Sequence, residues 1–167
     1  MDIRWKPSVT VAAIIEREGR FLLVEEETVD GLKLNNPAGH LEPGESPAEG
    51  CARETLEETG HLFRPTALLG IYLVRTRRNS TGDDATYLRL AFCGELGARD
   101  AARPLDHGIV RTLWLTPAEI RDSAERHRSP LVLKCVEDYL AGNRYPLSII
   151  YTDPSGTGVS GGSLNRP

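Results

Sequence analysis

The first apolar stretches of the chain are separated by short polar breaks, a pattern that is typical of β-strands. Residues 9–15 and 21–24 are rich in Val, Ile, Leu and Phe, and the polar residues 16–20 between them include a glycine. A short break with a glycine between two β-forming runs favours a tight turn. We therefore expect these two runs to pair as a hairpin, followed by a short strand over residues 33–36.

Longer β-forming runs occupy the middle of the chain. Residues 66–75 and 85–96 combine β-branched, aromatic and leucine residues, and a polar loop over residues 76–84 separates them. Neighbouring runs joined by a short loop usually pair in antiparallel fashion. Residues 109–116 form one more apolar run of the same kind, so a further strand is expected there.

Helix-start signals interrupt this series of strands. Ser46 is followed by a proline and then by Glu49, which is the pattern of a capping box, and Gly60 is well placed to end that helix. Similar Ser/Thr-Pro starts occur at Thr116 and Ser129. Strands and helices in this order predict an α+β domain with a mixed, largely antiparallel sheet and helices packed on it.

Chain length and composition suggest one domain with a short extension. A chain of 167 residues suits a single core, which we assign to residues 1–150. Residues 151–167 are rich in Gly, Ser and Pro and offer little to bury, so we expect a flexible tail. The sequence leaves the oligomeric state open.

Charge and cysteine content narrow the possible partners and the compartment. The formal net charge is −4, which argues against a broad electrostatic grip on duplex nucleic acid. The chain contains no apolar segment of membrane-spanning length, so we expect no membrane association. Three well-separated cysteines form no CxxC pair and suggest buried, reduced thiols. We therefore expect a cytoplasmic protein whose partners are small molecules.

The helix after Ser46 carries an unusual density of negative charge. At 100° per residue, Glu54, Glu57 and Glu58 fall on one narrow stripe beside an apolar face. A solvated acidic face is the ordinary interpretation of such a stripe. Two features favour a metal site instead: Glu57 and Glu58 lie in the last turn, where the helix dipole disfavours anions, and we find no cation placed to pair with them at i+3 or i+4.

Oxygen ligands from this helix and from the turn before it suit a hard divalent cation. The carbonyl groups of residues 37–39 could face the same side as the carboxylates. Such ligands favour Mg²⁺, with Mn²⁺ as a second possibility. Glu45 and Arg53 are close enough to form an ion pair, for which we expect a structural role that fixes the loop to the helix.

The polar and glycine positions of this segment resemble the Nudix box, G-x5-E-x7-R-E-U-x-E-E-x-G-U. Gly39, Glu45 and the run from Arg53 to Gly60 match at the right spacing, whereas Thr55 and His61 stand where the pattern has bulky aliphatic residues. Because those two positions pack rather than react, the departures bear on local packing. The resemblance to Nudix domains extends over residues 6–150.

This resemblance implies a fold and a chemistry. Nudix domains are α/β/α sandwiches with a catalytic loop-helix-loop, and they hydrolyse nucleoside diphosphates linked to another group with the help of Mg²⁺. The resemblance places Glu54, Glu57 and Glu58 as catalytic and metal-binding residues, with the Gly39 carbonyl as a further ligand. One of these glutamates, or a carboxylate from a later loop, would deprotonate the attacking water.

Within the family, several segments resemble a bacterial Nudix phosphatase. They include residues 35–42, 87–96 and 142–150. That resemblance implies a phosphatase of nucleoside tri- and diphosphates and of the pyrimidine (hydroxymethylpyrimidine) pyrophosphate precursor of thiamine. The alternative is a pyrophosphohydrolase of another nucleotide, such as an oxidised nucleoside triphosphate, a dinucleoside polyphosphate or a nucleotide sugar. A non-catalytic nucleotide-binding module is a more distant alternative, because the carboxylates of the box are complete.

Further side chains are candidates for contacts with the substrate. Arg89 alternates within a β-forming run, and its guanidinium suits phosphate geometry, although it could also face solvent. Lys33 and Lys6 are weaker candidates. Glu26 could serve the site or end a strand, and His40 could contact a phosphate or make a structural hydrogen bond in its loop.

Overall fold

A five-stranded mixed sheet forms the centre of the protein. The computed structural model describes residues 4–77 and 84–158. The sheet has the order β5-β1-β7-β6-β9 and contains β1 (Ser8–Ala13), β5 (Ala38–His40), β6 (His61–Arg77), β7 (Asp84–Arg99) and β9 (Tyr145–Pro146). β1 and β7 run parallel, and the other neighbours are antiparallel. The expected pairing of the two long central runs is confirmed.

A second, antiparallel sheet of four strands lies beside the first. It contains β2 (Glu16–Arg17), β3 (Arg20–Thr28), β4 (Gly31–Asn35) and β8 (Ile109–Leu115), with β3 between β4 and β8. The predicted hairpin of residues 9–15 with 21–24 is therefore wrong for most of its length. Only the residues around β2 pair back onto β3, whereas β1 enters the other sheet. Both faces of β1 are buried, so its apolar run reflects a position inside the central sheet.

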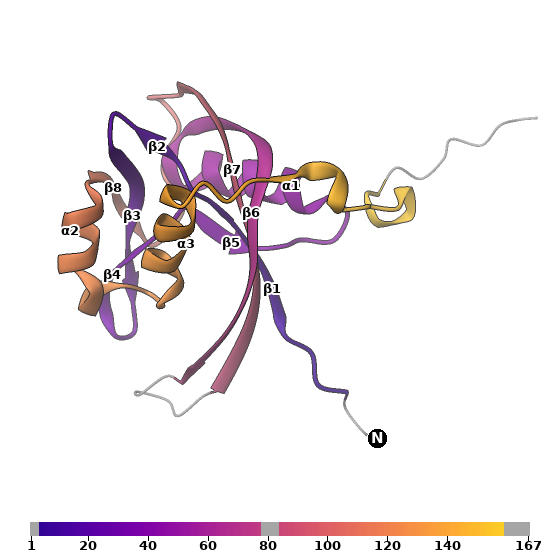
Figure 1. Cartoon of the computed structure of the whole chain (residues 1–167), viewed down its shortest axis with the longest axis horizontal. Coiled ribbons are helices and arrows are strands. Elements are labelled where there is room, and N and C mark those ends of the chain that lie inside the picture. The colour runs from indigo at the N-terminus through magenta and orange to yellow at the C-terminus, as the bar shows by residue number, and fades with distance from the viewer. Residues whose placement is uncertain (1–3, 78–83, 159–167) are drawn as a thin grey trace, which may run out of the picture.

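The helices cover the sheets on two sides. α1 (Pro47–Thr59) packs on β1, β5 and β6, whereas α2 (Pro117–Asp122) and α3 (Leu131–Leu140) gather with the second sheet (Figure 1). The described residues also form short 3₁₀ turns, namely η1 (Ala124–Arg126), η2 (Leu147–Ile149) and η3 (Pro154–Gly156). The outcome is the expected α+β sandwich, in which two layers of apolar residues fill the faces of the central sheet.

Alternate residues of β1 belong to the two different cores. Ala12 joins a cluster with Phe21 and the α3 residues Val132 and Val136. Its neighbour Val11 joins a second cluster that includes Cys51 of α1. Because successive strand residues point to opposite faces, β1 links the acidic helix on one side to the second sheet and α3 on the other.

The ends of α1 follow the sequence signals closely. The Ser46 side chain accepts a hydrogen bond from the Glu49 backbone, and the Glu49 side chain accepts from Ser46 in return. Gly60 ends the helix in the left-handed conformation, at φ 72°, and its N–H donates to the Leu56 carbonyl. The acidic stripe therefore lies on a helix with well-defined ends, positioned by the loop that precedes it.

Part of the predicted tail lies close to the domain. Gly158 approaches Gly44 in the loop before α1, and Ile150, which directly precedes the tail, packs against the core that contains Cys51. The remainder, residues 159–167, lies outside the described residues, as does most of the predicted loop at residues 76–84, namely 78–83. Among the described residues, no helix has the length and apolarity needed to cross a membrane.

We predict that Gly60→Ala lowers the free energy of unfolding by about 1–2 kcal/mol, because a side chain at this φ is strained. An added Cβ would also meet the Asp100 carbonyl oxygen at 3.3 Å. Urea denaturation measures the change. Gly60→Asn is the matched control and should lose less stability than Gly60→Ala, because asparagine tolerates the left-handed region. Equal stability of Gly60→Ala and the wild type would contradict the prediction.

Candidate active site

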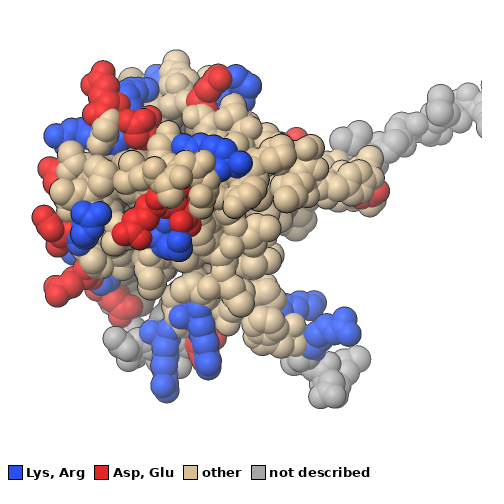
Figure 2. All heavy atoms as spheres, viewed as in Figure 1, with Lys and Arg blue, Asp and Glu red and all other residues tan. Residues whose placement is uncertain are grey.

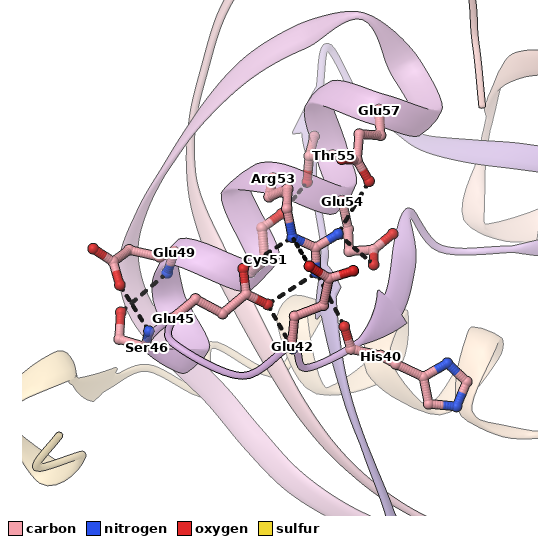
Figure 3. Close-up of polar contacts among 10 residues, drawn as sticks. All are labelled: His40, Glu42, Glu45, Ser46, Glu49, Cys51, Arg53, Glu54, Thr55 and Glu57. Atoms are coloured by element: carbon pink, nitrogen blue, oxygen red, sulfur yellow. Dashed lines mark hydrogen bonds and ion pairs between the residues drawn. The ribbon is translucent and has the colours of Figure 1, made fainter. Parts of the chain in front are cut away.

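The guanidinium of Arg53 is the centre of a polar network at the start of α1 (Figure 3). Its Nε donates to Glu45 Oε2 at 2.9 Å, and its Nη2 donates to Glu45 Oε1 at 2.9 Å and to the His40 carbonyl at 3.0 Å. Its Nη1 donates to Glu54 at 2.8 Å and to Glu57 at 3.0 Å. A bidentate contact of this kind fixes the loop of Glu45 firmly to the helix.

The contact between Arg53 and Glu57 corrects one sequence-based expectation. We found no cation placed to pair with the last-turn glutamates, but Arg53 pairs with Glu57 in i,i+4 fashion. The long arginine side chain reaches along the helix surface and so enters the acidic stripe from its edge. One guanidinium therefore faces three carboxylates, and the stripe keeps an excess of negative charge.

Strand β5 lies directly against the acidic helix. Glu58 Oε2 accepts a hydrogen bond of 2.9 Å from the Ala38 N–H. A Cβ at residue 39 would lie only 2.1 Å from the Glu54 carboxyl carbon, so the site requires a glycine there. β1 holds this strand in place through the pairs Val11–Gly39 and Ala12–Ala38. The backbone of β5 therefore lies against the carboxylates of α1.

Burial makes these carboxylates reluctant to ionise. Burial raises the pKa of Glu58 to about 9 against the hydrogen bond from the Ala38 N–H, and the charges of Glu54, Glu26 and Asp106 add smaller upward contributions. Burial also raises the pKa of Glu54, against the effect of Arg53. A cation placed among them would favour the charged forms and reverse these shifts.

The oxygen-rich character of the site fits a hard divalent cation. Within residues 4–77 and 84–158, no three His, Cys, Asp or Glu side chains already converge at the spacing of a bound ion. Glu54 and Glu57 both face Nη1 of Arg53, so a metal would share their oxygens with that N–H. Burial disfavours the ionised forms of Glu54 and Glu58, and a bound cation would stabilise both as carboxylates.

A cavity of about 290 Å³ adjoins β5. Ala38, Gly39 and His40 form part of its lining, and Glu26 of β3, Arg89 of β7 and Tyr87 of β7 face it from the two sheets. The His40 and Tyr87 rings are tilted against each other, with centroids 6.2 Å apart. β5 thus contacts both the carboxylates of α1 and the cavity.

Arg89 lies at the buried end of this cavity. Only 6% of the residue is exposed. Its Nη1 and Nη2 donate to the Oδ1 atoms of Asn36 and Asn35, at 3.2 and 3.3 Å, and its Nε has no partner among the described residues. Burial lowers the pKa of Arg89 and raises that of Glu26, which lies beside it. The alternative of a solvent-facing arginine is thus wrong, because Arg89 points into the interior.

Three of the five predicted substrate-contact residues line the cavity, namely Glu26, His40 and Arg89. Neither Lys6 nor Lys33 lines it. The Lys33 Nζ instead donates at 3.2 Å to the Glu125 carbonyl in η1. The His40 ring points away from the Arg53 network, while its carbonyl oxygen belongs to that network (Figure 3).

Two charged residues near the site had no specific signal in the sequence. Asp106 lies in the loop before β8, its N–H donates to the Glu57 carbonyl at 2.9 Å, and its charge raises the pKa of Glu54 and Glu58. Arg128 lines the cavity and lies 3.5 Å from Glu26. The turn-forming residues after Asp106 and the helix start after Arg128 marked loops, but only the fold brings these loops to the site.

The comparisons with known proteins agree with this geometry. The NUDIX domain matches residues 4–135 of the chain. The chain belongs to the Nudix family. It is also 40% identical to the phosphatase NudJ of Escherichia coli K12 over 147 residues, which cover 87% of this chain and 92% of that protein. The protein is accordingly a hydrolase that acts on phosphorus-containing anhydrides, in a family that uses divalent metals.

Solved structures of Nudix proteins share the fold. A NUDIX hydrolase from Nitrosomonas europaea is 52% identical, with a TM-score of 0.82 over 89% of this chain and 99% of that one. The E. coli ORF135 protein, at 22% identity, has a TM-score of 0.61 over 81% of this chain and 90% of that one, and it supports the fold alone. The Nudix box is thus set in a Nudix sandwich.

We predict that Glu45→Gln destabilises the protein at pH 7 by about 1–2 kcal/mol, because it breaks a largely buried, charge-assisted pair. Arg53 lowers the pKa of Glu45 in the folded protein. The stabilisation is therefore present above the unfolded pKa of about 4.3 and is lost as pH falls through the lower folded value.

Denaturation of the wild type and of Glu45→Gln at several pH values measures this effect. The difference in the free energy of unfolding between the two proteins should be largest at pH 7 and should shrink below about pH 4. Glu137→Gln, which removes an exposed carboxylate on α3, is the control and should stay close to the wild type throughout. A difference that grows towards acid pH would contradict the assigned role of the pair.

Proposed function

We propose that the protein is a Mg²⁺-dependent phosphatase of small pyrophosphates. Its substrates would be nucleoside tri- and diphosphates and the hydroxymethylpyrimidine pyrophosphate precursor of thiamine. The observation that carries the proposal is the position of β5, whose residues Ala38 and Gly39 touch the carboxylates of α1 and also line the cavity that contains Arg89. The similarity to the phosphatase NudJ supports the choice of reaction.

Glu54, Glu57 and Glu58 would hold the metal, with the Gly39 carbonyl as a further ligand. Mn²⁺ could replace Mg²⁺, because both prefer oxygen ligands. When bound, the metal supplies charge neutralisation for the phosphates and lowers the pKa of water. Arg53 would keep Glu54 and Glu57 in position from the side of the loop, and Glu45 would hold Arg53 there.

Carboxylates and cations of the chain would accept the proton of the attacking water and bind the substrate. A box glutamate, or Asp106 as the carboxylate of a later loop, would accept the proton of the attacking water. Arg89 would bind a phosphate, because its guanidinium lines the cavity and has only the neutral partners Asn35 and Asn36. Glu26 and His40 would complete the substrate contacts, whereas Lys33 would act at a distance by holding η1.

The protein would work in the cytoplasm on small molecules. Cys51, Cys93 and Cys135 are free and buried, which suits a reducing compartment. The main alternative is a Nudix pyrophosphohydrolase that cleaves a different nucleotide. A non-catalytic binding module is disfavoured because the acidic residues of the box are all present.

The products distinguish these candidates. We predict Mg²⁺-dependent release of orthophosphate from several nucleoside tri- and diphosphates and from the hydroxymethylpyrimidine pyrophosphate. Ion chromatography that resolves orthophosphate from pyrophosphate is the measurement, with an EDTA-treated sample as control. Release of pyrophosphate with a nucleoside monophosphate would favour the alternative hydrolase, and inactivity on every substrate would favour the binding module.

We also predict that Glu57→Gln and Glu58→Gln each lower turnover at saturating Mg²⁺ by at least roughly a hundredfold, which is the size expected when one preorganised electrostatic group is lost. The fold should survive, because each change keeps the side-chain shape. Circular dichroism checks the fold, and Glu137→Gln serves as the charge-matched control. Rates near the wild-type value in both variants would refute this assignment of the metal ligands.

A further inference from the structure

The cavity next to β5 is lined by several arginines that lie outside the acidic helix. Three guanidinium-bearing residues from different parts of the chain line it: Arg77 at the end of β6, Arg89 in the middle of β7, and Arg128 just before α3. Glu26 and Asp30 are the acidic residues of the same lining. Cations that converge in this way indicate an anionic occupant.

Arg89 is the most informative of the three. Its hydrogen-bond partners, Asn35 and Asn36, are neutral amides, and among the described residues it makes no ion pair with a carboxylate. Burying a charge in this way is costly unless an opposite charge approaches it. With neutral partners only, the guanidinium of Arg89 can attract an anion that enters the cavity it lines.

Arg128 reaches the same cavity from the segment that precedes α3. Its backbone N–H donates to the Leu34 carbonyl at 2.8 Å, which fixes the position of the residue independently of its side chain. Its Nε lies 3.5 Å from Glu26 Oε1, a loose contact, and 37% of its side chain is exposed. The guanidinium can therefore exchange its contact with Glu26 for one with a ligand.

The wall that carries Arg128 is attached to the second sheet at several points. Arg126 forms an ion pair with Glu25, Lys33 donates to the Glu125 carbonyl, and His127 forms a bridge with Leu34. These contacts hold residues 124–129 against β3 and β4. Lys33 and Arg126 are thus positioning residues for the wall.

Asn35 and Glu26 connect the two guanidinium groups across the cavity. Asn35 Oδ1 accepts from Arg89, Asn35 Nδ2 lies 3.5 Å from Glu26 Oε1, and that same oxygen faces Arg128. We propose that Arg89 and Arg128 together bind the terminal phosphate of the substrate in this cavity, so that the nucleoside or pyrimidine remains outside it. This inference rests on the proposed phosphatase function and assigns the orientation of its substrates.

Cavity size and substrate range agree with this orientation. A volume of about 290 Å³ lies at the lower end of the range for small-molecule pockets and is better matched to a phosphate than to a whole nucleotide. The proposed substrates differ in their organic part and share a terminal diphosphate. A site that reads the phosphate would accept them all, with little preference for the base.

Surface charge near the cavity favours the approach of such substrates. Figure 2 shows Lys and Arg side chains gathered where the β6–β7 hairpin and the start of β1 project from the body. Arg75 and Arg77 lie near that end of β6; Arg75 pairs with Asp84, whereas Arg77 lines the cavity. A basic rim of this kind attracts polyphosphates, and its effect weakens with salt.

The test compares Arg128→Gln with the wild type in two measurements. The first is kcat/KM for ATP, GTP, CTP, UTP and the hydroxymethylpyrimidine pyrophosphate. The second is binding of orthophosphate to the metal-free protein, followed by ³¹P NMR titration. We expect kcat/KM to fall by a common factor of roughly ten to one hundred for every substrate, as for the loss of one charge-assisted hydrogen bond. Orthophosphate binding should weaken by a comparable factor.

Two further variants and one control sharpen the result. Arg128→Lys should recover part of both losses, because it keeps the charge but not the fork of donors. Glu26→Gln should tighten orthophosphate binding, because it removes the negative charge beside the phosphate. Arg121→Gln removes an exposed arginine of α2 and should change neither measurement. Thermal denaturation verifies that each variant is folded.

Losses that differ strongly between bases would overturn the inference, because they would place the base in the cavity. Unchanged orthophosphate binding in Arg128→Gln would overturn it as well. If the wild type releases pyrophosphate rather than orthophosphate, the proposed function fails, but the binding measurement remains independent of it. Loss of orthophosphate binding in that case would still support the cavity as a phosphate site.

Discussion

The hydrogen bonds of Arg53 hold the loop before α1 and the helix itself in one arrangement. A single cation there faces Glu45, Glu54 and Glu57, and the His40 carbonyl accepts from the same group. Without it, neighbouring carboxylates would repel one another across the stripe. With it, the stripe is ordered but not neutral, and that remaining negative charge is what a Nudix enzyme uses to attract a divalent metal.

Strand β5 converts this local arrangement into a site. Its backbone approaches the acidic helix so closely that residue 39 has no space for a side chain. The Ala38 N–H reaches Glu58 from the same strand, and Ala38 and Gly39 also line the neighbouring cavity. The carboxylates of α1 and the arginine-lined cavity therefore meet along β5. The position of three strand residues thus determines how charge is distributed around this part of the molecule.

Local sequence signals predicted much of this arrangement. The features that depend on contacts between residues far apart in the sequence could not be predicted. The spacing from Gly39 to Gly60 identified the box, and the caps of α1 follow directly from Ser46, Glu49 and Gly60. The hairpin of the first two runs was wrong because an apolar run does not reveal which sheet it joins, and β1 pairs with β7 rather than with β3. Arg128 was missed because its approach to Glu26 depends on residues about one hundred positions apart. Contacts at such separation leave no periodic pattern in the sequence.

The wall formed by residues 124–129 allows the cavity to change during evolution independently of the acidic helix. It belongs to neither the acidic helix nor β5, and it is attached to the second sheet through Glu25, Lys33 and Leu34. Mutations in this segment can reshape the cavity while the carboxylates of α1 and their Arg53 partner stay as they are. Natural selection can therefore alter which pyrophosphate is accepted, one surface segment at a time, in a lineage whose catalytic apparatus remains constant.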